Sequence, residues 1–343
     1  MNGPKSPPNA DPIARLEDLT VQFTAGGPPV RAVNGVSLSL AQSEILCIIG
    51  ESGSGKSVTL RALMRLLPER RTKLTGKIEI DGQNVLSLTP RALRNLRGGV
   101  VSMVFQEPMT ALDPVYTVGA QIAETVRRHK GGTAQAARAR ALELLELVGV
   151  PSAKRRLDAY PHELSGGLRQ RAMIALALSC GPRLLLADEP TTALDATVQI
   201  QVLLLLRRLR DEFGMAIIFV THDLGVAAQI ADRIAVMYAG RIVEEGPVAE
   251  VLGNPLHPYT KGLLASDVDS VPAGEPIAAI AGAPPDLRAL PPGCSFAPRC
   301  HLAVDACVEA VPGIWRRDEH HMARCIRADA RAELPHEEGV YDA

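Results

Sequence analysis

The octapeptide GESGSGKS at residues 50–57 restricts the possible folds of this chain more than any other feature. It follows the apolar run EILCIIG (44–50) and precedes VTLRALMRLL (58–67), a helical pattern that a proline stops. A glycine-rich loop between a strand and a helix turns successive backbone N–H groups toward phosphate oxygens. We therefore expect Lys56 to reach the β- and γ-phosphates of a nucleotide and Ser57 to bind Mg²⁺. The alternative is a chance Gly/Ser loop, which the flanking strand and helix disfavour.

Three further strand-like runs each end at a polar residue. RLLLADEP (183–190) delivers Asp188 and Glu189, AIIFVTHD (216–223) ends near His222, and VVSMVFQEP (100–108) contains Gln106. Because such runs alternate with helical patterns, we expect an α/β fold with a largely parallel sheet, whose strand ends meet at one crevice. Asp188 would then hold Mg²⁺ through water, and Glu189 would accept a proton from an attacking water. Taken singly, each residue has a plainer alternative: solvated acids, a structural histidine or a surface glutamine.

The segment ELSGGLRQR (163–171) places Ser165, Gly166 and Gly167 before a helical pattern, which makes a second anion-binding helix N-terminus. One chain needs no second such site for one nucleotide, unless that site serves the nucleotide of a partner. This segment resembles the signature of ABC ATPases. The order of motifs agrees over roughly residues 13–250: Phe23, residues 50–57, Gln106, 164–168, 184–189, TALD at 192–195, and His222.

The resemblance implies a P-loop NTPase fold, with a RecA-like core, a helical subdomain and an antiparallel β subdomain. It implies that Phe23 stacks on adenine and that the ATP-binding residues are Phe23, Gly50, Ser52, Gly53, Ser54, Gly55, Lys56, Ser57, Val58, Gln106, Asp188, Glu189 and His222. Ser57, Gln106 and Asp188 would bind Mg²⁺, the last through water. Glu189 would be the catalytic base, acting with His222, Lys56 and Gln106.

The resemblance also assigns Ser165, Gly166, Gly167 and Asp195 to the nucleotide of an opposite subunit. Two positions depart from the family pattern: Leu168 stands where Gln is usual, and TALD replaces the commoner SALD. Neither change touches the positions expected to bind Mg²⁺ or to act as base, so we expect this chain's own site to hydrolyse ATP.

A narrower resemblance rests on NPLHPYTKGLL (254–264), FQEPMTALDP (105–114) and DATVQIQVL (195–203). These strings are similar to the ATPases of oligopeptide and dipeptide permeases. That likeness implies a second, different ABC ATPase subunit, two transmembrane permease subunits and an extracytoplasmic peptide-binding protein. Nickel and some oligosaccharide importers share the same strings, so these cargoes remain alternatives to peptides.

Four of the six cysteines lie near the end of the chain, with the spacing C-x5-C-x6-C-x17-C: Cys294, Cys300, Cys307 and Cys325. Four thiolates can complete the ligand shell of a [4Fe–4S] cluster or of Zn²⁺. The wide spacing favours the cluster, which some of the resembled permease ATPases carry. Zinc stays an alternative with His301, His320 and His321 as substitute ligands, and so do four thiols without metal. The other two cysteines, Cys47 and Cys180, lie in apolar runs typical of a core.

The chain carries a formal net charge of −1, which argues against a nucleic-acid partner. Its longest apolar runs, such as AMIALALSC (172–180), are too short to cross a bilayer, and its start has no secretory pattern. We therefore expect a peripheral protein at the cytoplasmic face of the cell membrane. A non-transport ABC ATPase of DNA repair or translation is disfavoured, because it usually carries a coiled-coil insertion or two cassettes in one chain. A regulatory subunit with a dead ATP site is opposed by the intact Lys56, Asp188 and Glu189.

The same patterns divide the chain into segments. We expect a flexible arm at 1–12, a nucleotide-binding domain at 13–255 whose helical subdomain is 107–170, a C-terminal domain with the four cysteines at 256–335, and a tail at 336–343.

Overall fold

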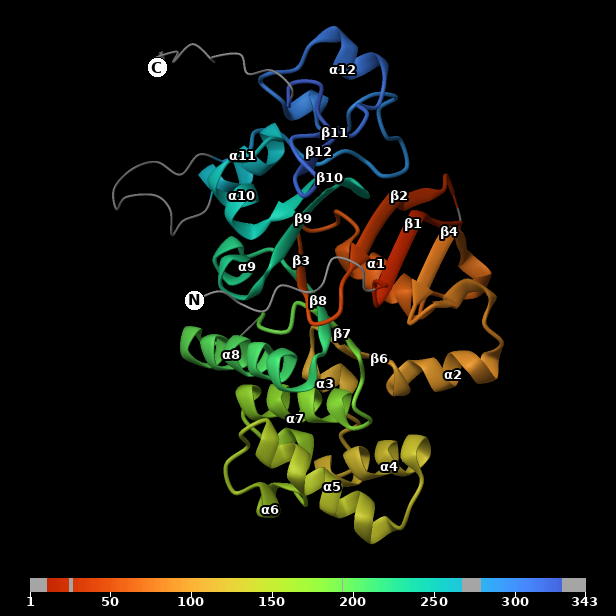
Figure 1. Ribbon diagram of the computed structural model, residues 1–343, viewed down its shortest axis with the longest axis vertical. Helices are drawn as coiled ribbons and strands as arrows, with labels where there is room; N and C mark the ends of the chain where they lie inside the picture. Colours follow the sequence, from red (N-terminus) through yellow and green to blue (C-terminus); the bar gives the residue numbers. More distant parts are fainter. Residues whose placement is uncertain (1–10, 25–26, 193, 267–278, 329–343) are drawn as a thin grey trace.

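A computed structural model describes residues 11–24, 27–192, 194–266 and 279–328 of the chain (Figure 1). Most of the expected arm at 1–12 and the whole expected tail at 336–343 lie outside these residues.

The centre of the molecule is an eight-stranded sheet with the strand order β11-β12-β10-β9-β3-β8-β7-β6. Five consecutive strands of this sheet, ending at the edge strand β6, run parallel, in agreement with the expected α/β fold: β9 (Arg233–Tyr238), β3 (Ile45–Ile49), β8 (Ala216–Thr221), β7 (Leu184–Asp188) and β6 (Val101–Val104). β3, β6, β7 and β8 are buried along their whole length. Burial on both faces explains why these strands read as continuous apolar runs rather than as alternating patterns.

The side chains of β3 alternate between two hydrophobic clusters, one on each face of the sheet. Ile45, Cys47 and Ile49 belong to the cluster that contains residues of α7 (Gly166–Leu178), α8 (Ala196–Phe213) and α9 (Leu224–Ile230). Leu46 and Ile48 belong to the cluster that contains residues of α1 (Lys56–Leu63) and of a separate antiparallel sheet. The core sheet is therefore covered on both faces, as a parallel sheet requires.

The antiparallel sheet has the strand order β2-β1-β4-β5 and stands at one side of the core sheet (Figure 1). Its strands are β1 (Ala14–Phe23), β2 (Val30–Leu40), β4 (Thr72–Ile80) and β5 (Gln83–Asn84), and α2 (Pro90–Gly99) follows it. Phe23 closes β1 opposite Val30, the first residue of β2.

A helical layer lies at the other end of the molecule (Figure 1). It contains α3 (Pro108–Ala111), α4 (Val118–Lys130), α5 (Ala134–Leu147) and α6 (Ala153–Arg156). The side chains of Thr117 and Thr133 accept hydrogen bonds from the third residue of α4 and of α5, which caps both helices. α5 ends at Leu147, two residues before Gly149, whose φ is +74°.

The C-terminal residues pack onto the core sheet instead of forming a core of their own. α10 (Val248–Gly253), α11 (Pro258–Ala265) and α12 (Asp305–Glu309) follow β10 (Arg241–Pro247), and the hairpin β11 (Trp315–Arg316) and β12 (Met322–Ala323) joins the sheet beside β10. Tyr238 of β9 contacts Tyr259 and Phe296, with ring centroids 4.5 Å and 5.3 Å apart. One continuous core therefore includes this region.

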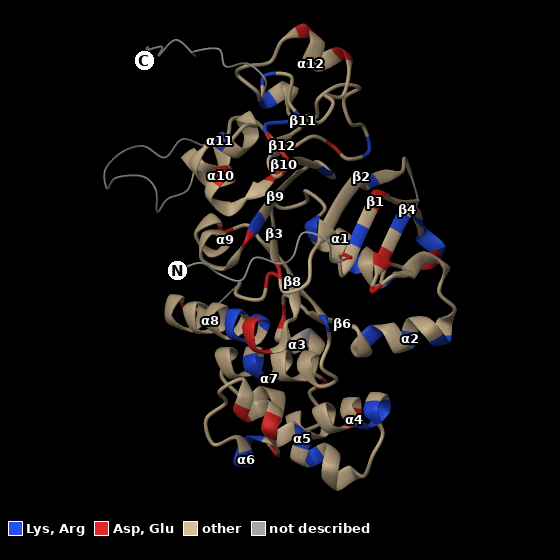
Figure 2. Cartoon of the chain, in the orientation of Figure 1, with Lys and Arg blue, Asp and Glu red and all other residues tan. Residues whose placement is uncertain are grey.

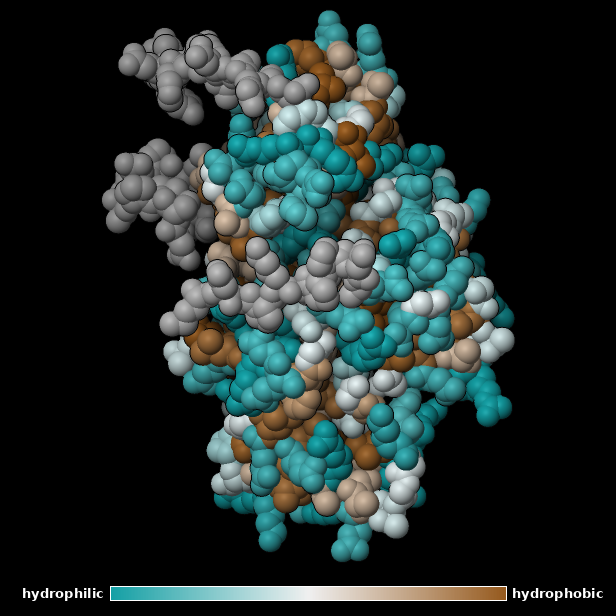
Figure 3. Space-filling view, in the orientation of Figure 1, coloured by the Kyte–Doolittle hydropathy of each residue, from teal (hydrophilic) through white to brown (hydrophobic). Residues whose placement is uncertain are grey.

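In the described part of the chain, charged residues of both signs are interspersed over the helices and strands (Figure 2). The space-filling view shows a mostly hydrophilic face, with hydrophobic residues gathered over the lower helices (Figure 3). Within the described part of the chain, no helix has the length and apolar character needed to cross a membrane.

Candidate functional site

The glycine-rich loop between β3 and α1, residues 50–57, has a backbone that only glycine permits at two points. Gly50 has φ +149° and Gly55 has φ +109°. A Cβ atom at Gly50 would lie 2.1 Å from the carbonyl oxygen of Met237, and one at Gly55 would lie 2.3 Å from that of Ala32. The neighbouring strands β9 and β2 thus press directly on this phosphate-binding loop and fix its path.

Lys56 is buried at the first turn of α1 and folds back over the loop. Its Nζ donates to the carbonyl oxygens of Gly50 at 2.6 Å and of Glu51 at 3.0 Å. Burial lowers the pKa of Lys56, while the charges of Glu189, Asp188 and Glu51 act to raise it. The ammonium group is therefore held at the mouth of the loop, where an anion would be bound.

Asp188, the last residue of β7, is buried and directed at the start of α1. The Ser57 hydroxyl donates to its Oδ1 at 2.6 Å. Its Oδ2 is buried without a hydrogen-bond partner, and the nearest cation is the Arg61 guanidinium at 3.8 Å. Burial raises the pKa of Asp188, because the carboxylate is only partly compensated.

The carboxylate of the next residue, Glu189, is contacted by three polar side chains that come from other strand ends and loops. Gln106 Nε2 donates to Glu189 Oε2 at 3.3 Å, Thr192 Oγ1 donates to the same oxygen at 3.0 Å, and His222 Nδ1 lies 3.3 Å from it. Glu189 has φ +46°, a left-handed backbone uncommon for a non-glycine residue. The strand ends meet at one crevice, as the sequence predicted. Thr192 was not expected here, although it is the first residue of the TALD motif.

A cavity of about 590 Å³ joins the loop to this carboxylate. The expected site residues that line it are Ser52, Gly53, Ser54, Gly55, Lys56, Ser57, Val58, Gln106, Glu189 and His222. Phe23, Gly50 and Asp188 are not among its lining residues; Phe23 is half-buried against the core on the side of the antiparallel sheet. Ala32, Thr192 and Leu287 also line the cavity and were missed by the sequence analysis.

The residues expected to serve a partner's nucleotide do not line this cavity. Ser165 is exposed at the N-terminus of α7, and its side chain does not cap its own helix. Asp195 is exposed as the N-cap of α8, where it accepts from the N–H of Val198 at 2.9 Å. Leu168, which departs from the family pattern, packs against the hydrophobic core.

The cysteines divide as expected between core and C-terminal region, but the metal expectation is not supported. Cys47 and Cys180 are buried. Across residues 11–24, 27–192, 194–266 and 279–328, no group of three or more His, Cys, Asp or Glu side chains is placed to hold a metal ion. This applies to the iron–sulfur expectation at Cys294, Cys300, Cys307 and Cys325 and to the zinc alternative.

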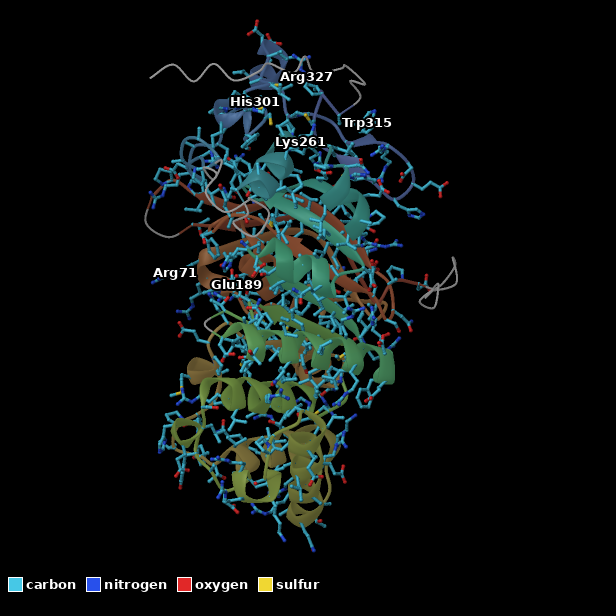
Figure 4. All side chains as sticks on the ribbon, turned by 90° about the vertical axis from the view of Figure 1, so that its left-hand side faces the viewer. Arg71, Glu189, Lys261, His301, Trp315 and Arg327 are labelled. Carbon is cyan, nitrogen blue, oxygen red and sulfur yellow. The ribbon has the colours of Figure 1, made fainter. Side chains whose placement is uncertain are left out.

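The histidine ligands considered for zinc also have other surroundings. His321 is fully buried, and its Nε2 lies 2.8 Å from Glu244 Oε1, while His301 and His320 are exposed. Lys261, His301 and Arg327 mark the C-terminal end of the molecule in Figure 4, far along the chain's long axis from Glu189.

A phosphate-binding loop, a carboxylate pair at the end of β7 and a second helix N-terminus that does not line the cavity define an ATP-hydrolysing ABC ATPase. In agreement, the family "ABC transporter" matches residues 33–192, and "Oligopeptide/dipeptide transporter, C-terminal region" matches residues 243–307. The chain belongs to the family of ABC transporter ATP-binding proteins that carry this C-terminal region.

The relatives agree over nearly the whole chain. A putative peptide import ATP-binding protein of Brucella abortus is 50% identical, over 92% of this chain and 97% of the relative. The dipeptide transport ATP-binding protein DppD of Bacillus subtilis is 46% identical, over 94% and 96% of the two chains. A dimeric bacterial ABC transporter cassette is similar in structure, with a TM-score of 0.62 and 31% identity over 68% of this chain and 98% of that chain.

Proposed function

We propose that this ATPase powers the import of di- and oligopeptides across the cytoplasmic membrane. The observation that carries the catalytic part is the convergence of Gln106, Thr192 and His222 on the Glu189 carboxylate beside the phosphate-binding loop. The peptide cargo is supported by the names of the relatives from B. abortus and B. subtilis, which refer to peptide import and dipeptide transport.

We propose that the triphosphate of ATP occupies the 590 Å³ cavity, with the loop N–H groups and Lys56 on its phosphates. Phe23 would stack on the adenine. Ser57, Gln106 and Asp188 would hold Mg²⁺, and the buried, unpartnered Oδ2 of Asp188 fits such a role because a lone buried carboxylate oxygen needs a cation or a water. When bound, Mg²⁺ would neutralise charge on the β- and γ-phosphates.

In the hydrolytic step, Glu189 Oε2 would take a proton from the attacking water while Gln106 and His222 orient that water. Lys56 would offset the charge that develops on the γ-phosphate. Each of these side chains comes from a different strand end or loop, so their arrangement around the nucleotide depends on the packing of the parallel strands.

A second ABC ATPase subunit would complete the site. Ser165, Gly166, Gly167 and Asp195 are placed away from this chain's own cavity, which supports a role at the nucleotide of an opposite, related subunit. The likeness to a cassette solved as a dimer is consistent with such a pair. We expect no nucleic-acid partner.

We further propose the domain boundaries of the chain and the role of each domain. The nucleotide-binding domain would be 13–255, its helical subdomain 107–170 would contact a transmembrane permease subunit, and 256–335 would be the C-terminal domain. The protein would thus lie at the cytoplasmic face of the membrane. An extracytoplasmic peptide-binding protein would deliver the cargo to the permease subunits and would not contact this chain.

The four C-terminal cysteines would carry a [4Fe–4S] cluster in the assembled protein. What supports this is the set of four thiol donors together with proximity: the N–H of Cys294 donates to the Cys307 carbonyl oxygen at 2.7 Å, and Cys300 and Cys325 each lie close enough to Cys307 to interact with its charge. A cube of iron and sulfur also accepts ligands set farther apart than a single ion does. Protein purified without oxygen should contain four iron atoms and absorb visible light; iron-free, colourless and folded protein would refute the cluster.

Transport in vesicles tests the function. The complex of this chain with its ATPase partner and permease subunits is reconstituted so that the ATPases face the vesicle lumen, and the binding protein and labelled dipeptides are added outside. The vesicles should accumulate the dipeptides only when the lumen contains ATP. Glu189→Gln should abolish uptake and ATP turnover while ATP still binds. ATP-driven uptake of nickel or oligosaccharides, but of no peptide, would overturn the peptide assignment and leave the ATPase assignment intact.

A further inference from the structure

The second residue of the phosphate-binding loop, Glu51, is held by the C-terminal region. Arg299 donates from Nη1 to Glu51 Oε2 at 2.8 Å and from Nη2 to Glu51 Oε1 at 3.1 Å, which makes a bidentate salt bridge. The Arg299 side chain is only 5% exposed. The backbone N–H of Glu51 also donates to the Tyr259 hydroxyl at 2.9 Å. Two residues more than 200 positions away in sequence thus fix one residue of the loop.

Arg299 is itself tied to its surroundings. Its Nε donates to the carbonyl oxygen of Ala281 at 2.9 Å, its Nη2 donates to that of Ile280 at 3.2 Å, and its Nη1 donates to the Tyr238 hydroxyl at 3.3 Å. A guanidinium with all its sides engaged has one available orientation, so it holds the Glu51 carboxylate in one place and neutralises its charge there.

The chain between these contacts reaches the nucleotide cavity. The N–H of Arg31 in β2 donates to the carbonyl oxygen of Leu287 at 3.0 Å, and Leu287 lines the nucleotide cavity. A second cavity of about 370 Å³ lies beside it, lined by Glu51, Ser52 and Gly53 of the loop together with residues 284–288. Residues 280–299 therefore contact the loop, and through Leu287 they also form part of the wall of the nucleotide cavity.

Glu51 has a direct effect on the site in two ways. Its carbonyl oxygen accepts from Lys56 Nζ at 3.0 Å, so its backbone position sets where the ammonium group rests. Its carboxylate places a negative charge on a loop that must bind a polyanion, and Arg299 neutralises that charge.

We propose that Arg299 is a positioning residue of the ATP site, through which the C-terminal region sets the affinity of the phosphate-binding loop for nucleotide. Arg299 does not contact the nucleotide; it acts through Glu51. This inference rests on the nucleotide site proposed above.

The test uses the full chain and measures the dissociation constant of Mg·ATP by titration, and kcat in the reconstituted transporter. Arg299→Gln leaves the Glu51 carboxylate unpaired, so the dissociation constant should rise about tenfold with kcat changed less than about twofold. Arg299→Gln combined with Glu51→Gln removes that charge and should recover most of the affinity. The matched control Arg317→Gln, an exposed arginine of the same region, should bind as the parent does.

Unchanged affinity in Arg299→Gln would overturn the inference, and so would equal weakening in the single and double variants, because the loss would then be structural. If the wild-type chain bound no ATP, or if Lys56→Ala bound ATP as well as the parent, the proposed site itself would fail, which is a distinguishable result.

A second measurement needs no variant. Coupling is reciprocal, so Mg·ADP binding to the wild-type chain should slow amide hydrogen exchange in residues 297–300, which surround Arg299 and do not line the nucleotide cavity. Protection confined to residues 50–57 and 284–288, with none in 297–300, would also refute the role.

Discussion

Glu244 of β10 provides the sharpest test of how the C-terminal region is attached to the ATPase core. Its carboxylate is fully buried and accepts three hydrogen bonds. Oε1 accepts from the N–H of Leu256 at 2.8 Å and lies 2.8 Å from His321 Nε2, and Oε2 accepts from the N–H of His257 at 2.9 Å. One carboxylate therefore joins β10, the turn before α11 and the start of β12.

The change Glu244→Gln keeps size and shape but replaces one acceptor by a donor. If the amide oxygen takes the place of Oε1, the amide nitrogen faces the N–H of His257, and one buried donor loses its partner. An unsatisfied buried donor costs about 1–3 kcal/mol. We expect the opening free energy at the turn before α11 to fall by that amount, which corresponds to amide exchange about 5- to 150-fold faster.

Hydrogen exchange of the Leu256 and His257 amides, followed by mass spectrometry on the full chain, measures this directly. The control is Glu250→Gln, whose carboxylate is 44% exposed and lies 3.8 Å from the Arg317 guanidinium; it should change opening by less than about 0.5 kcal/mol. If the two amides exchange no faster in Glu244→Gln than in the control, the carboxylate does not hold this junction and the reasoning is wrong.

Three further predictions concern pH, the loop and the partner site. Burial lowers the pKa of His257 to about 4, so the unfolded chain takes up the proton first as the pH falls below about 6.5; unfolding free energy should decline from there to pH 4. His257→Asn keeps a capping acceptor and should reduce that decline by about 2–3 kcal/mol in urea titrations at pH 7 and pH 4.5. Gly50→Ala places a Cβ against the Met237 carbonyl oxygen and should abolish ATP binding in a titration, with a melting temperature at least several degrees lower. Ser165→Arg should leave ATP binding by the isolated chain unchanged yet stop turnover in the assembled transporter; weaker binding by the isolated chain would contradict a role in trans.

The sheet and the polar cluster at its edge followed from local sequence. β3, β7 and β8 are apolar runs buried on both faces, and such runs can be predicted as buried strands without any knowledge of the rest of the fold. Gln106, Glu189 and His222 each follow a run of this kind, so parallel packing alone predicts that they meet.

The contribution of the C-terminal region could not be inferred in the same way. Leu287 and Arg299 reach the nucleotide loop from irregular segments, whose sequence has no hydrophobic periodicity from which their contacts could be predicted. Their contacts depend on long-range packing of Tyr238, Tyr259 and Phe296. The four cysteines are a different case: their spacing predicts a ligand set, but no metal-holding group is placed among the described residues, because spacing in sequence does not fix where side chains point.

The hairpin of β11 and β12 has one more consequence, which concerns solubility. Glu244 and Glu245 of β10 pair with Ala323 and Met322, and the N–H of Arg324 donates to the Val243 carbonyl oxygen at 2.8 Å. A sheet edge with unpaired backbone groups recruits strands from other chains. The hairpin occupies that edge, so a chain cut before Trp315 would present β10 to its neighbours and should self-associate even with the ATP site intact.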